Sequence, residues 1–164
     1  MDPLTEPQIR RSFVNCSRSE AAAATLPAGL SDLPWDDLDF LGWRDARAPL
    51  RGYAVLWREG RPLGIALRAA DTAMSARTSA MCLLCQTTQT GADVSLFTAR
   101  RAGEAGRNGN TVGQYVCADL ACSSRVRTEI PPWLRERDPA EVVPERVDEL
   151  RRRLDTFVGH VLRP

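Results

Sequence analysis

Four of the five cysteines form two close pairs with the composition of a metal site. Two residues separate the cysteines of "MCLLCQTT", and four separate those of "YVCADLACSS"; the pairs are Cys82 with Cys85 and Cys117 with Cys122. Zinc takes four donors at tetrahedral corners, and thiolates bind it at about 2.3 Å. Because a C-x2-C turn directs two sulfurs toward one ion, we predict that the four cysteines bind one Zn²⁺.

Three other interpretations of these cysteines compete with zinc. Unrelated buried cysteines rarely fall into two close pairs around a hairpin pattern. A redox pair of the thioredoxin kind requires a buried strand before Cys82, and "SAM" is not such a strand. An iron–sulfur centre also uses four thiolates, and spacing alone does not exclude it. Zinc is the leading prediction.

A site closed by four thiolates has no open coordination position, so its expected role is structural rather than catalytic. In peptides such binding contributes on the order of 10–16 kcal/mol, enough to hold a hairpin that buries little apolar surface. Four thiolates and one Zn²⁺ carry a net charge of −2. The basic residues nearest in sequence, which we expect to compensate this charge, are Arg100, Arg101, Arg125 and Arg127.

The segments around the cysteines predict the elements that position them. "VSLFTAR" and "TVGQYVC" read as two strands joined by the wide turn "RAGEAGRNGN", and "ADLACSSRVR" reads as the start of a short helix. Cys117 then ends a strand and Cys122 lies in a first helical turn, where free amides and the helix dipole favour a thiolate. A knuckle, a hairpin and a helix in this order are typical of a treble-clef zinc finger, here at about residues 80–128.

Elsewhere the chain predicts further helices and a hairpin. Capping boxes start helices at Thr5 with Gln8 and at Ser17 with Glu20, and "RGYAVLW" and "PLGIALR" flank a hairpin turn. "DLPWDDLDFLGWRD" is expected to be a structured loop or short helix, and residues 71–79 a mobile connector. The side chains expected to anchor that loop are Trp35, Phe40 and Trp43.

The C-terminal segment predicts a helix over about 144–162. Pro144 suits a first helical position. One apolar stripe follows at helical spacing, formed by Val147, Leu150, Leu154, Phe157 and Val161. Together these patterns predict a single domain over residues 1–164 of α+β class, with a small antiparallel sheet, flanking helices and an embedded treble-clef zinc finger.

Composition narrows the function classes. Hydrophobic residues make up 43% of the chain and the formal charge is +1, which argues against disorder and against a broad nucleic-acid-binding surface. No run of about 18 apolar residues is present, and the acidic N-terminus does not resemble a signal peptide. We therefore expect a cytoplasmic protein with no membrane contact and no disulfide framework.

No group of residues predicts catalysis. His160, the single histidine, lies near the end of the C-terminal helix, where a positive charge favours the dipole. The carboxylates of Asp36, Asp37 and Asp39 lack a partnering base or nucleophile, so we expect them to be solvated or to cap helices. Cys16 is expected to be a small core residue. The chain is thus predicted not to be an enzyme and to take no small-molecule substrate.

Five strings together resemble one known family: "SFVNCS", "LPWDDLDFLGWRD", "MCLLCQTT", "VSLFTARRAG" and "GNTVGQYVCADLACS". They are similar to the C-terminal treble-clef zinc-finger domain of the elongation factor G-binding protein family, over roughly residues 4 to 162. The resemblance implies that the four paired cysteines hold one zinc ion. It also implies a translation-factor-binding protein whose partner is elongation factor G, possibly on the ribosome.

The best-known members of this family release elongation factor G from ribosomes trapped by fusidic acid. They carry a helical bundle ahead of the domain, whereas this sequence begins almost directly at it. The resemblance therefore supports binding of the factor more strongly than a role in antibiotic resistance. Aromatic and arginine side chains dominate interface energies where they are exposed. The candidate partner-binding residues are Phe97, Arg100, Arg101 and Tyr115.

Alternatives remain for this surface. Phe97 could instead pack beneath the hairpin as core, and Tyr115, on the same side of its strand as Cys117, could pack against the metal site. The competing function is an RNA- or ribosome-binding zinc module. It would use Arg100, Arg101, Arg107, Arg125 and Arg127.

Overall fold

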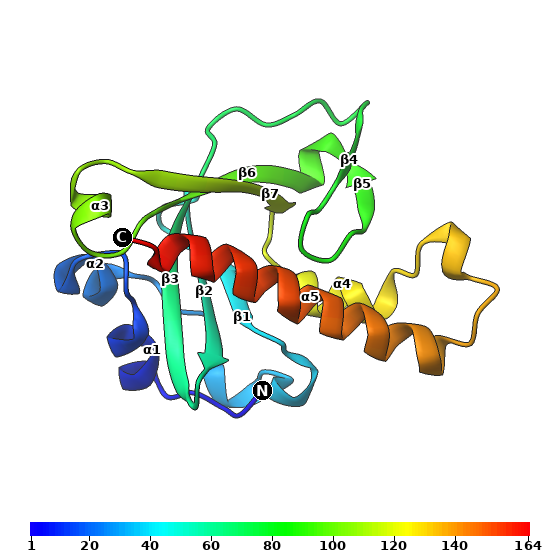
Figure 1. The fold of residues 1–164 in the computed structure, drawn as a ribbon, viewed down its shortest axis with the longest axis horizontal. Helices are drawn as coiled ribbons and strands as arrows, with labels where there is room; N and C mark the ends of the chain where they lie inside the picture. The colour runs from blue at the N-terminus through cyan, green and yellow to red at the C-terminus, as the bar shows by residue number, and fades with distance from the viewer.

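A five-stranded antiparallel sheet organises the structure, a computed structural model that describes all of residues 1–164 (Figure 1). The strand order is β1-β2-β3-β6-β7. The strands are β1 (Leu41–Arg44), β2 (Arg51–Arg58), β3 (Arg61–Ala69), β6 (Val94–Arg100) and β7 (Thr111–Cys117). A separate two-stranded sheet pairs β4 (Ser79–Met81) with β5 (Thr88–Thr90).

Helices flank the sheet, which confirms the predicted α+β class. The helices are α1 (Glu6–Ser12), α2 (Arg18–Ala23), α3 (Gly103–Arg107), α4 (Cys122–Thr128) and α5 (Pro139–Leu162). Short 3-10 turns cover Leu30–Asp32, Trp35–Asp37, Gly91–Asp93 and Pro132–Leu134. No helix has both the length and the apolar character needed to cross a membrane.

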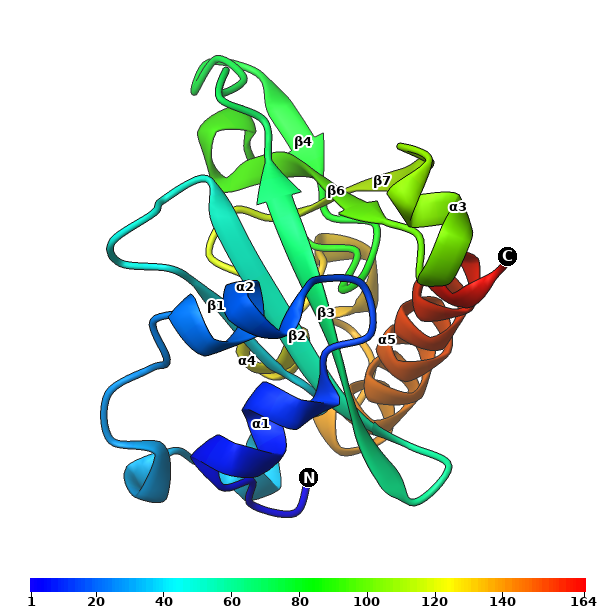
Figure 2. The ribbon, with the colours of Figure 1, turned by 90° about the vertical axis from the view of Figure 1, so that its left-hand side faces the viewer.

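The sheet separates two hydrophobic cores. Strand alternation sends Ala54 and Leu56 of β2 into the larger core, and Tyr53 and Val55 into the smaller one. Figure 2 shows α1 and α2 on one face of β2 and β3, with α5 on the other. The apolar stripe predicted on α5 is buried in the larger core, as expected from its helical spacing.

The predicted β2–β3 hairpin and both capping boxes are confirmed. Glu59 and Gly60 join the strands with positive φ angles of 51° and 74°, the backbone twist that two-residue hairpin turns favour. At the second box, Ser17 N donates to Glu20 Oε2 at 2.8 Å and Glu20 N donates to Ser17 Oγ at 3.1 Å. These elements depend on neighbours in sequence, which is why local patterns predict them.

Three short elements lie where loops were predicted. The segment "DLPWDDLDFLGWRD" contains β1 after its 3-10 turn, residues 71–79 end in β4, and α3 lies inside the wide turn between β6 and β7. Elements of three to five residues are too short to show a period. The three aromatic anchors of the first segment are nevertheless buried as expected, namely Trp35, Phe40 and Trp43.

The C-terminal helix begins at Pro139, five residues before the predicted start. Asp138 caps it by accepting from Ala140 N at 2.9 Å, and Pro139 takes the first helical position, where a missing N–H costs nothing. Pro144 therefore lies inside the helix, where it removes one hydrogen bond near the N-terminal end. The helix therefore begins after the capping residue Asp138, and not at Pro144, where the sequence pattern predicted its start.

Candidate metal centre

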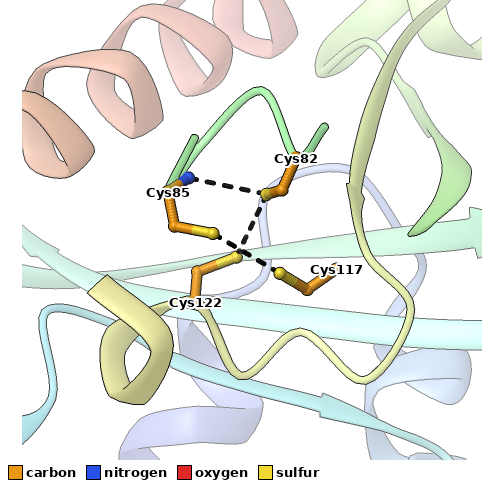
Figure 3. A group of neighbouring side chains, drawn as sticks. All are labelled: Cys82, Cys85, Cys117 and Cys122. Carbon is orange, nitrogen blue, oxygen red and sulfur yellow. Dashed lines mark hydrogen bonds between the residues drawn. The ribbon is translucent and has the colours of Figure 1, made fainter. Parts of the chain in front are cut away.

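The four paired cysteines converge on one buried point (Figure 3). Cys82 and Cys85 come from the turn between β4 and β5, Cys117 ends β7, and Cys122 is the first residue of α4. Their sulfur atoms all lie within 4.8 Å of one another. This is the predicted order of knuckle, hairpin and helix, so the segment has the arrangement of a treble-clef zinc finger.

The sulfur separations fit a tetrahedral ion. Cys82 Sγ lies 3.7 Å from Cys122 Sγ, and Cys85 Sγ lies 3.5 Å from Cys117 Sγ. Zinc–sulfur bonds of about 2.3 Å place neighbouring sulfurs roughly 3.8 Å apart in a tetrahedron, whereas a disulfide requires about 2.05 Å. The cluster therefore has the dimensions of a four-thiolate zinc site, and the zinc would hold the knuckle, hairpin and helix together.

Both cysteine turns contain a non-glycine residue with left-handed backbone. Gln86 has φ 54° and Leu120 has φ 62°. Gln86 N donates to the Cys82 carbonyl and Leu120 N donates to the Cys117 carbonyl, each at 2.9 Å. A left-handed conformation is costly for residues with a Cβ. The two turns are thus bent alike so that both sulfurs of each pair face one centre.

Neutral polar groups contact the sulfurs. Gln89 Nε2 donates to Cys117 Sγ at 3.2 Å, and the Thr87 hydroxyl lies 2.7 Å from Cys85 Sγ. Partners of this kind orient metal ligands and tune their charge. Sequence reasoning did not identify them. The sequence feature that could have identified them is their position: Thr87 and Gln89 lie two residues apart directly after the C-x2-C turn.

Arg146 of α5 is a buried cation that approaches the centre from outside the finger. It is 9% exposed, and it donates to the Val126 carbonyl at 2.7 Å and to the Cys85 carbonyl at 3.4 Å. Burial lowers the pKa of its guanidinium, while attraction to Cys85 opposes this. Arg146 was missed because it lies 61 residues from Cys85 in sequence.

The arginines predicted to compensate the centre serve different roles. Arg125 donates to Asp119 at 2.6 Å, and this hydrogen bond, with a smaller attraction to Cys117, raises its pKa. Arg127 donates to Asp39 at 2.6 Å. Arg100 is the last residue of β6 and Arg101 follows it, at the opposite end of the hairpin from the ligand Cys117.

The predicted partner-binding residues do not form one surface. Phe97 is 1% exposed in the larger core, so its assignment as a partner contact was wrong, and its alternative as core is correct. Tyr115 is 43% exposed rather than packed against the metal site. Arg100 pairs with Thr111 of β7, which puts it roughly 13 Å along the strand from Tyr115.

Two exposed apolar residues beside the ligands were not predicted. Met81 is 43% exposed and Leu83 is 42% exposed. Leu83 N donates to the Tyr115 carbonyl at 2.9 Å, so the turn with the first two ligands lies against β7. We name Met81, Leu83 and Tyr115 the knuckle patch. The sequence feature that could have identified Met81 and Leu83 is that one apolar residue lies on each side of Cys82.

Of the remaining candidates, Asp39 differs most from expectation. Its side chain is fully buried between Arg127 and Arg151 instead of being solvated. Asp36 and Asp37 are exposed in a 3-10 turn, and Cys16 is a half-buried free thiol rather than a core residue. His160 lies in the last turn of α5 as predicted.

Comparisons with known proteins agree with this geometry. A family model described as FBP C-terminal treble-clef zinc-finger matches residues 8–161. Among solved structures, that of the fusidic acid resistance protein FusC matches with a TM-score of 0.54 and 16% sequence identity, over 75% of this chain and 52% of that chain. The chain spans about half of that protein, and at this identity the likeness concerns the fold. No curated protein matches the chain in sequence.

Proposed function

Because this chain belongs to the FBP C-terminal treble-clef zinc-finger family, we propose that it binds elongation factor G and modulates its release from the ribosome. The partner is the one implied by the resemblance of the sequence strings to the elongation factor G-binding proteins. The fold shared with a fusidic acid resistance protein supports the same direction. In this proposal the protein acts by binding rather than by catalysis, because four thiolates leave the metal no position for a substrate.

The knuckle patch is the observation that carries this proposal. Large apolar side chains are exposed at four positions of the chain, and three of them are the members of this patch. The fourth is Trp133, which is 66% exposed on the 3-10 turn before α5. Exposed apolar groups on a rigid element favour protein contact, and the metal would make the knuckle rigid.

A calorimetric titration of the zinc-loaded protein against elongation factor G from the same source tests the proposal. We expect saturable binding near one-to-one. Leu83→Asp should weaken it at least about tenfold, as expected for a central apolar contact, whereas Trp133→Ala is the matched control with an exposed apolar residue outside the patch. Absence of heat together with absence of co-migration in gel filtration would contradict the proposal.

The arginines that end β6 have their own test. Arg100→Glu combined with Arg101→Glu should weaken partner binding and leave the zinc content unchanged, if the interface extends along the hairpin. Unchanged affinity in this double variant, with loss of affinity in Leu83→Asp, would confine the interface to the knuckle end.

The competing RNA-binding function has less support. It needs five arginines, and two of them, Arg125 and Arg127, are bound to the carboxylates of Asp119 and Asp39. A salt series separates the two functions. Phosphate contacts weaken steeply with salt concentration, whereas an apolar interface at the knuckle patch should be nearly insensitive to it.

A further inference from the structure

A pocket on the α1–α2 side of the sheet contains three arginines and a single acidic residue. Its volume is about 220 Å³. Its floor includes Arg51, Arg68 and Arg100, and its wall, from the α1–α2 connection and α2, includes Cys16 and Glu20. Figure 2 shows α2 lying over this part of the sheet. The pocket is separate from the metal centre and shares no residue with the knuckle patch.

The strand register sets two like charges against each other. Arg51 of β2 pairs directly with Arg68 of β3, and Arg68 pairs on its other side with Thr98 of β6. Arg100 lies two residues beyond Thr98 and therefore on the same face. Like charges directly opposite on one face of a sheet are destabilising. An anion between these guanidinium groups would relieve that repulsion.

The neighbouring groups compensate only part of this positive charge. Of the three arginines only Arg100 forms an ion pair, with Glu20 Oε1 at 3.8 Å. The other carboxylate oxygen of Glu20 accepts from Ser17 N in the capping box. Burial, reinforced by the charge of Glu20, raises the pKa of Cys16 to about 11, so this thiol adds no negative charge near neutral pH. Three arginines and one glutamate leave a net charge of +2.

Size and charge together select the ligand. Pockets for drug-sized molecules measure about 300–1,000 Å³, so this one suits a single small group. Planar guanidinium groups bind phosphate oxygens through paired hydrogen bonds. We propose that this pocket binds phosphate, as the free ion or as the terminal group of a small phosphate monoester. The arginines hold the phosphate oxygens, and Glu20 competes with the ligand for Arg100.

Calorimetric titration of the zinc-loaded chain with inorganic phosphate, at ionic strength fixed with chloride, tests this site. We expect one saturable site that Arg68→Gln weakens at least about tenfold, because charge-assisted hydrogen bonds are lost. Arg61→Gln, an exposed arginine at the other end of β3, is the matched control and should bind as the parent does. Equal weakening by the two variants, or no saturable binding, would overturn the proposal.

Glu20→Gln provides a test in the opposite direction. Glutamine preserves the capping box but frees Arg100, so phosphate should bind more tightly than to the parent protein. Unchanged or weaker binding would contradict the role assigned to Glu20. A parallel titration with glycerol 3-phosphate distinguishes the two sources: tighter binding than phosphate indicates a monoester ligand, and weaker binding indicates the free ion.

A binding experiment with RNA tests the remaining alternative, that these arginines form a nucleic-acid-binding surface. An adjoining cavity of about 310 Å³ shares Arg100 and Glu20 and adds Arg101 and Arg107. If a short single-stranded RNA binds, weakens in Arg68→Gln and is not displaced by phosphate, the arginines serve a nucleic-acid surface and the phosphate proposal fails. Displacement of that RNA by phosphate at fixed ionic strength supports it.

Discussion

Arg127 of α4 donates a hydrogen bond of 2.6 Å to Asp39, whose side chain is completely buried. Arg151 of α5 donates to the other carboxylate oxygen at 2.9 Å. The backbone N–H of Asp39 donates to the hydroxyl of Ser123, the residue after the ligand Cys122. A single carboxylate thus joins the helix of the zinc finger, the C-terminal helix and the segment that leads into β1.

Asp39→Asn should destabilise the protein by about 3 kcal/mol or more, because it leaves Arg127 without its buried counter-charge. Arg151→Gln should cost less than about 1 kcal/mol, because the Arg151 side chain is 57% exposed. Urea denaturation of the zinc-loaded variants measures both free energies of unfolding. Similar small losses in the two variants would show that the carboxylate does not join these elements energetically.

Cys122→Ser should lower the zinc content and unfold residues 80–128 locally, because structural zinc sites contribute folding free energy directly. Cys16→Ser is the control, since Cys16 is outside the cluster, and it should keep one zinc per chain. Metal analysis and limited proteolysis measure the two effects. Full zinc stoichiometry with unchanged protease resistance in Cys122→Ser would remove this residue from the ligand set.

Arg146→Met should weaken zinc binding by about 10–100-fold, the range typical when an outer partner of a metal site is lost. Methionine keeps much of the buried volume but removes the charge and the bonds to the Val126 and Cys85 carbonyls. Competition with a chromophoric chelator measures the affinity. Arg152→Met, on the exposed side of the same helix, should retain the parent affinity; if it loses as much, helix stability is responsible instead.

Gln86→Gly should raise the free energy of unfolding by up to about 1 kcal/mol. Relief of the left-handed conformation, about 1–2 kcal/mol, exceeds the entropy that glycine loses on folding, about 0.5–1 kcal/mol. Thr88→Gly, an exposed substitution within β5, should instead be destabilising. Thermal unfolding of both zinc-loaded variants tests the contrast, and destabilisation by both would mean that Gln86 is not strained.

Asp45→Asn should reduce stability near neutral pH but not in acid. Burial raises the pKa of Asp45, but hydrogen bonds from the backbone N–H groups of Thr25, Arg47 and Ala48 outweigh it, so the net pKa is lowered. A carboxyl with a lowered folded pKa stabilises the protein above its unfolded pKa of about 3.9, and that stability is lost as pH falls through the folded value.

The measurement is the difference in unfolding free energy between parent and Asp45→Asn across pH. The difference should be constant above about pH 5 and shrink below about pH 4. Using the difference matters because acid protonates the thiolates and releases zinc from both proteins. Asp36→Asn, which removes an exposed carboxylate, is the control for loss of a negative charge alone, and a constant difference for Asp45→Asn down to pH 2 would contradict the assignment.

Local features of the chain were predictable because their partners are close in sequence. The spacing of Cys82 and Cys85 predicted a knuckle, the capping box at Ser17 predicted a helix start, and the apolar period after Pro144 predicted the buried stripe of α5. Each depends on contacts within a few residues. The same reasoning misplaced the start of α5, because Pro144 also suits a first helical position, and it missed β1, α3, β4 and β5, because these elements are too short to show a period.

Tertiary structure alone decided which side chains are buried and paired. Phe97 is core because α5 covers its face of the sheet. Asp39 is buried because Arg127 and Arg151, 88 and 112 residues away, neutralise it. Arg51 lies opposite Arg68 because of the register between β2 and β3. Arg100 joins these two arginines on the same face because β6 pairs with β3. By itself the sequence determined the four thiolate ligands of the metal and the family. Packing decided the surroundings of each charge, because electrostatic partners that are distant in sequence become neighbours only in the folded structure.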